Sequence, residues 1–162
     1  MLPLAGDRKP FPFLQTPLNE ANGKFSPDGQ WMAYMSDETG GADIYVRPFG
    51  QGSAAGSQEA AGKWRISGEG AGQACWRADG KELFYLTLDG KLMAVDVKAG
   101  TSKGRPTLAA GVPKLLFDAR AQRFFPFAVT TDGQRFLINT AIAEEKPQTL
   151  TVVVNWAAGL KR

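Results

Sequence analysis

Short apolar segments, separated by turns rich in glycine and acidic residues, follow one another along most of the chain. A first set is aromatic or aliphatic and too brief for stable helices; it comprises residues 31–35, 82–86 and 135–138. A second set follows after another turn, at residues 43–48, 91–97 and 149–156. This pattern predicts an all-β protein made of short strands.

An Asp-Gly pair precedes each segment of the first set, and these pairs form an internal repeat. They are Asp28-Gly29, Asp79-Gly80 and Asp132-Gly133, with the aspartates 51 and 53 residues apart. Aspartate can accept a hydrogen bond from its own backbone two residues on, and glycine supplies the positive φ of a tight turn, so we interpret the six residues as structural turns. A four-stranded β-propeller blade with one long loop has about this length.

The repeat predicts an all-β fold, a β-propeller fragment of about three four-stranded antiparallel blades. The expected units are residues 1–16, which hold leftover strands of a preceding blade, then 17–68, 69–119 and an incomplete third blade at 120–162. Outer strands are expected at residues 11–16, 62–67 and 113–118. The chain is therefore expected to begin in the middle of a blade.

One copy of the repeat carries a more specific motif. Residues 25–29 read Phe-Ser-Pro-Asp-Gly, residues 32–37 Met-Ala-Tyr-Met-Ser-Asp, and residues 41–46 Gly-Ala-Asp-Ile-Tyr-Val. This arrangement closely resembles the TolB-like β-propeller repeat, although Ala78 and Thr131 replace its proline in the other two copies.

The whole chain also resembles the C-terminal part of the propellers that follow Ser/Thr kinase domains in some bacterial proteins, up to and including residues 154–161. This resemblance implies a non-catalytic sensor or interaction module, cut from a longer polypeptide whose intact ring has roughly six or more blades.

Composition narrows the chemistry. The 162 residues include no histidine and one cysteine. This excludes Ser-His-Asp and Cys-His catalytic arrangements, histidine-ligated zinc, an intrachain disulfide and a Cys-x-x-Cys metal site. Cys75 is interpreted as a small buried apolar residue. We therefore expect no enzymatic activity, no cofactor and no metal.

Charge and hydropathy indicate an ordinary surface. The chain has 19 Lys+Arg and 16 Asp+Glu, a net charge of +3, and its basic residues are scattered singly. We expect neither nucleic-acid binding nor, without a run of 18 apolar residues, a membrane-spanning helix. The first residues do not form a secretory signal, so the bacterial cytoplasm and an extracytoplasmic sensor region both stay open.

Several features that suggest binding sites have plainer interpretations. Asp37 and Asp43 flank glycines but lack the ligand spacing of an EF-hand, and the glycine-rich stretches at 50–55 and 68–72 precede strand-like segments instead of helices. We interpret the stretches as loops. Four tryptophans on or beside predicted strands are expected to fill the space between blades: Trp31, Trp64, Trp76 and Trp156.

The candidate surface for a partner or ligand lies just before the third repeat, at Arg120, Arg123, Phe124 and Phe125. Loops before the innermost strand of a blade reach the mouth of the central channel, where propellers bind ligands. We expect the two arginines to contact an anionic group or an acidic partner.

Together these observations predict a non-catalytic binding or scaffolding module that contacts proteins or ligands. Its partner is another protein or a second copy of this chain. In the second case, residues 11–16 of each copy would complete the third unit of the other, and two chains placed head to tail would form a six-bladed ring. Two alternatives stay open. The chain could be a propeller accessory domain of a Ser/Thr kinase or of a prolyl-oligopeptidase-like hydrolase whose catalytic part lies elsewhere, or a lectin-like or small-molecule binder.

Overall fold

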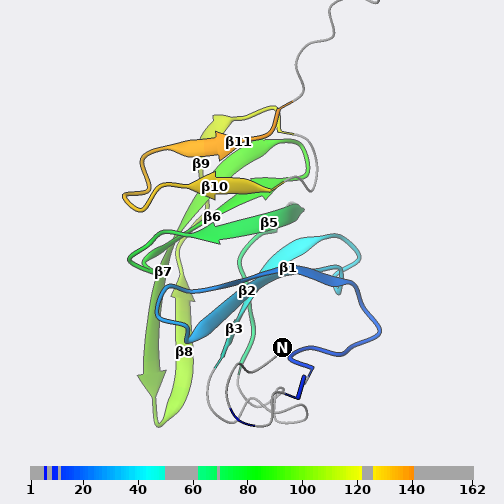
Figure 1. Ribbon diagram of the computed structural model, residues 1–162, viewed down its shortest axis with the longest axis vertical. Helices are drawn as coiled ribbons and strands as arrows, with labels where there is room; N and C mark the ends of the chain where they lie inside the picture. Colours follow the sequence, from blue (N-terminus) through cyan, green and yellow to red (C-terminus); the bar gives the residue numbers. More distant parts are fainter. Residues whose placement is uncertain are drawn as a thin grey trace, which may run out of the picture.

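The computed structural model describes residues 6, 9–10, 12–49, 62–68, 70–121 and 126–140, and its regular structure is entirely β-strand (Figure 1). The prediction of an all-β protein is confirmed. No helix that could cross a membrane is found in this part of the chain. The strands are β1 Glu20–Phe25, β2 Trp31–Ser36, β3 Asp43–Pro48, β4 Trp64–Arg65, β5 Ala71–Trp76, β6 Glu82–Thr87, β7 Lys91–Ser102, β8 Arg105–Ala110, β9 Lys114–Asp118, β10 Phe127–Val129 and β11 Phe136–Ile138.

The strands form three antiparallel sheets in chain order. The first sheet has the order β1-β2-β3-β4 and the third is the hairpin β10-β11. The second has five strands, in the order β5-β6-β7-β8, with β9 paired to the first half of β7. The expected outer strands at 62–67 and 113–118 are therefore present, the former shortened to two residues.

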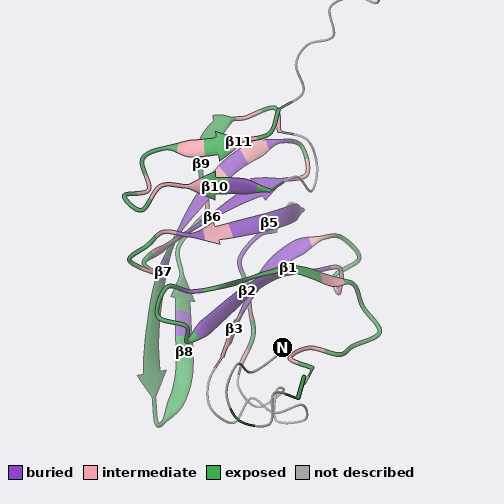
Figure 2. Ribbon diagram, viewed as in Figure 1, coloured by how far each residue is buried: buried purple, intermediate pink, exposed green. Residues whose placement is uncertain are grey.

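Alternating side chains hold the three sheets face to face. Strand residues point to opposite faces in turn, so each sheet can bury both of its sides. On β6, Leu83 packs with residues of the first sheet, while Phe84 packs with Phe127 and Phe136 of the hairpin. Figure 2 shows the buried residues concentrated in β2, β3, β5 and β6, at the middle of this stack.

Hydrogen bonds link the first strands of successive sheets. The Asn22 side-chain amide donates to the Gly72 carbonyl at 2.7 Å, and the Trp76 indole donates to the Lys24 carbonyl at 3.2 Å. On the other side of β5, the Cys75 thiol donates to the Phe127 carbonyl at 3.3 Å. Consequently β1, β5 and β10 are neighbours in space, although the three sheets pair only within themselves.

The expected strand at 11–16 is wrong for residues 12–16, which form no strand. Phe13 and Leu14 instead pack on the face of β2 and β3 that points away from the second sheet. Pro12 has no N–H to donate to a ladder, and the burial of Phe13 and Leu14 against β2 and β3 favours this position. The expected strand at 149–156 lies outside the described residues.

The second sheet carries a long hairpin that the sequence did not predict. Strand β7 continues beyond β6 and pairs with β8 from Val97 to Ser102. Lys103 and Gly104 connect them with φ values of 49° and 76°, as a two-residue type I′ turn requires. We call residues 97–110 the hairpin arm. Figure 1 shows it extending from the second sheet alongside the first.

Candidate binding surface

The three Asp-Gly pairs form turns of one geometry. In each turn the aspartate Oδ1 accepts the backbone N–H two residues on, at 3.0 Å, and the glycine N–H donates to the carbonyl three residues earlier, at 2.9 Å. The glycine φ values are 69°, 69° and 73° for Gly29, Gly80 and Gly133. The carboxylates of Asp28, Asp79 and Asp132 are thus already occupied by bonds that close the hairpins.

Asp79 has the strongest partner of the three. The Arg77 guanidinium donates to both of its carboxylate oxygens, at 2.9 and 2.7 Å. These bonds, together with the Lys81 backbone N–H, lower the pKa of Asp79 to about 2. The pKa of Asp132 is also lowered, by the Thr130 hydroxyl and then the backbone N–H of Gln134. Both groups therefore favour the folded state when ionised.

These lowered pKa values predict a loss of stability in acid. The folded state keeps the carboxylates ionised where the unfolded chain takes up protons, so stability is full above pH ~4 and declines as the pH falls towards ~2. We expect the Asp79→Asn variant to show a shallower decline than the wild type. Urea unfolding midpoints measured from pH 7 to pH 2 give both curves. Parallel curves would contradict the assigned role of this carboxylate.

The carboxylates of Asp37 and Asp43, which flank the glycines between β2 and β3, already accept hydrogen bonds from protein groups. Asp43 is buried; it accepts from the Ser67 hydroxyl at 2.8 Å and the Thr39 hydroxyl at 2.9 Å, and it pairs with Arg65 at 2.6 Å. Asp37 accepts the Asn19 backbone N–H at 3.0 Å. Within the described residues, no cluster of three or more acidic, histidine or cysteine side chains has the arrangement of a metal site.

Arg120 is the described member of the predicted partner surface. It follows β9 in a left-handed conformation with φ of 47°, and its backbone N–H donates to Asp118 Oδ1 at 3.0 Å. Arg120 is exposed, and its backbone lies against the Thr87–Lys91 turn, where a Cβ on Gly90 would lie 2.9 Å from the Ala121 nitrogen. Arg123, Phe124 and Phe125 lie outside the described residues, so their joint surface stays a prediction.

The cysteine and the tryptophans contribute mainly to packing. Cys75 is half-buried, and burial raises the pKa of its thiol, which disfavours the reactive thiolate. Trp31 and Trp76 belong to the core between the first two sheets, and Trp64 packs edge to face on Trp31 with ring centroids 5.6 Å apart. Trp156 and the glycine-rich stretch at 50–55 lie outside the described residues. The interpretation of residues 68–72 as a loop is wrong for Ala71 and Gly72, which begin β5, where Ala71 pairs with Thr87.

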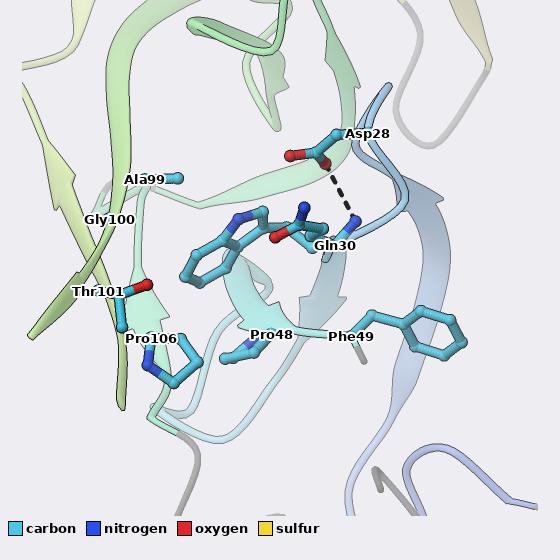
Figure 3. Close-up of a pocket in the computed structure, with 9 residues that line it drawn as sticks. Asp28, Gln30, Pro48, Phe49, Ala99, Gly100, Thr101 and Pro106 are labelled. Carbon is cyan, nitrogen blue, oxygen red and sulfur yellow. Dashed lines mark hydrogen bonds between the residues drawn. The ribbon is translucent and has the colours of Figure 1, made fainter. Parts of the chain in front are cut away.

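A groove beside the hairpin arm is the feature that sequence reasoning missed. One pocket of about 430 Å³ lies between the arm and the first sheet (Figure 3). A second, of about 840 Å³, continues beneath the first two Asp-Gly turns. The residues shared by both pockets are Asp28, Trp31 and Ala99. The groove could not be found without β8, whose sequence Arg-Pro-Thr-Leu-Ala-Ala lacks strand alternation.

Comparisons with known proteins identify no family for this chain: no family model matches it, and no curated protein matches it.

Proposed function

We propose that the protein is a stretch of TolB-like β-propeller that acts as a non-catalytic binding or scaffolding module within a larger or oligomeric propeller. The bonds between successive first strands carry this proposal. In a propeller the blades surround a central channel, so the first strand of each blade lies next to the first strand of the following one. The bonds from Trp76 to β1 and from Cys75 to β10 have this arrangement.

The two end faces of the stack support association through propeller closure. On the third sheet Leu137 is 77% exposed, so this strand presents an apolar side chain to solvent. At the opposite end Phe25 is 46% exposed and contacts Phe49 edge to face, with centroids 4.7 Å apart. Head-to-tail contact between two different faces generates a ring when the rotation closes. Because residues 12–16 form no strand, we propose that these faces join the copies without strand exchange.

Light scattering coupled to size-exclusion chromatography tests the self-association. We expect the wild type to elute at twice the mass of the 17.4-kDa chain, and small-angle scattering to indicate a closed particle. The Leu137→Asp variant should be a monomer, because it places a charge in the proposed contact. Val112→Asp is the matched control, since Val112 is 81% exposed and lies in the β8–β9 connection. A folded wild-type monomer throughout the micromolar range would contradict the dimeric propeller.

A further inference from the structure

No strand of the described chain covers either edge of the hairpin arm, the outer edge of β8 or the edge of β7 beyond β6, and the β7 edge is the one that borders the groove. Val97 N–H donates to the Lys81 carbonyl on the β6 side at 2.8 Å, so its peptide groups point away from β8. In an antiparallel ladder these directions alternate, and the backbone groups of Ala99 and Thr101 therefore also point away from β8. Thr101 pairs with Pro106, and proline has no N–H to donate. Proline fits there because the backbone groups of this pair do not bond to each other. The edge of β7 beyond β6 therefore offers the backbone N–H and C=O groups of Ala99 and Thr101 as two donors and two acceptors.

The open edge of β7 lies along the groove. The inner face of the arm points to the groove, and the outer face points away from it. Val97 and Leu108 are buried in the core between the sheets, which fixes the inner face of the arm. Ala99 and Thr101 share that face with Val97, because strand side chains alternate. Figure 3 shows Thr101 and Pro106 across the groove from Pro48, and Trp31 also lines this pocket. An added strand would place every second side chain in this groove, whose apolar part is formed by Trp31, Pro48 and Pro106.

The outer face and the tip of the arm are basic. Lys98 and Arg105 alternate with the inner-face residues, Lys103 occupies the turn, and Lys81 lines the groove beside Lys98. None of these four cations forms an ion pair within the part of the chain that the structure describes.

The nearby acidic groups already have partners. The carboxylate of Asp79 is bound by Arg77, and that of Asp96 pairs with Lys114 at 3.0 Å. Asp28 accepts from the Ser26 hydroxyl and from the backbone of Gln30. These partners do not cancel all of the negative charge, because Asp28 accepts only from neutral donors and Arg77 is shared between Asp79 and Glu82. Residues 97–110 themselves contain three cations and no carboxylate, so the arm is positive.

From the edge, the groove and the charge, we infer that the hairpin arm binds an extended acidic peptide of a partner protein as an added strand along Ala99–Thr101. Main-chain bonds to the open edge hold the peptide. Its apolar residues alternate into the groove beside Trp31 and Pro48, and its carboxylates face Lys98. This binding does not depend on ring closure, since it uses neither Leu137 nor Phe25.

A designed peptide of alternating glutamate and valine is the first probe, and the same peptide with lysine replacing glutamate is the second. Fluorescence polarisation measures the affinity of each. Amide hydrogen exchange followed by NMR reports on the Ala99 and Thr101 N–H groups. We expect the acidic peptide to bind and to slow exchange at these two amides, and the basic peptide to bind at least about tenfold more weakly. No binding of the acidic peptide at about 1 mM would overturn the inference.

Two proline variants locate the edge. Ala99→Pro removes an N–H from the open edge without breaking a bond to β8, and we expect it to weaken peptide binding at least about tenfold. Ala110→Pro is the matched control, because Ala110 pairs opposite Val97 and its N–H points to the outer edge of β8. Equal affinities of the two variants would contradict strand addition.

A charge variant keeps the inference testable if Ala99→Pro fails to fold. Lys98→Glu should weaken binding of the acidic peptide and improve binding of the basic one, because its side chain faces the outer side of the arm. Unchanged preference between the peptides would overturn the acidic specificity. If a second copy of the chain occupied the edge, the wild type would be a dimer in the absence of peptide and the Ala99→Pro variant would be a monomer. That result would also overturn the inference.

Discussion

Replacement of Leu83 by alanine is expected to lower the free energy of unfolding by about 3 kcal/mol. Leu83, the second residue of β6, is fully buried and packs in the core between the first and second sheets with Trp31, Val46 and Val95. Removing its isopropyl group both loses apolar burial and leaves a cavity, because two twisted sheets can close the space only partly.

Urea denaturation of Leu83→Ala and of Leu115→Ala gives the comparison. Leu115 lies in β9, the outer strand of the same sheet, and is 56% exposed, so its truncation should cost less than about 1 kcal/mol. Similar losses in both variants would mean that the two sheets do not pack face to face through β6.

The second large effect is expected at Asp43, where alanine should lower the free energy of unfolding by about 2 to 4 kcal/mol. This carboxylate is the common acceptor of Thr39 and Ser67 and the partner of Arg65, which together join β3 to the chain around β4. Its removal leaves the buried Ser67 hydroxyl without its carboxylate acceptor, whereas the Arg65 side chain is 42% exposed and can bind water. The effect comes mainly from the unsatisfied buried hydroxyl and the lost bonds of the carboxylate.

The Asp96→Ala variant is the control, because it removes a carboxylate from an ion pair that is exposed to solvent. Asp96 also pairs with a cation on a neighbouring strand, Lys114, but both side chains are more than half exposed. Solvent screens that pair, and we expect its loss to change stability by less than about 0.5 kcal/mol. Both variants are measured by urea denaturation at pH 7. A loss for Asp43→Ala as small as that for Asp96→Ala would contradict the cooperative role of the buried network.

Much of the local structure could be predicted because it depends on a few neighbouring residues. The Asp-Gly turns require only an acceptor and a residue that tolerates positive φ, and both are visible in sequence. Strands β2, β3 and β6 could be identified because aromatic and aliphatic residues dominate them.

The candidate sites were less predictable. Of the proposed partner surface the structure describes only Arg120, while the groove at Trp31 and Ala99 was missed because the arm that forms it has weak strand signals. Lys103-Gly104 is an uncommon type I′ pair, and β8 contains a proline.

By itself the sequence determined the all-β class, the repeated turns and the positions of most strands, since these follow from side-chain alternation and local backbone preferences. Only the tertiary structure decided which surfaces are open. Phe13 and Leu14 pack on the face of the first sheet because apolar surface is buried there, and the packing of one segment on another depends on the assembled sheet. The open edge at Ala99 exists because β7 extends beyond β6, and strand length relative to a neighbour is a property of the assembled sheet.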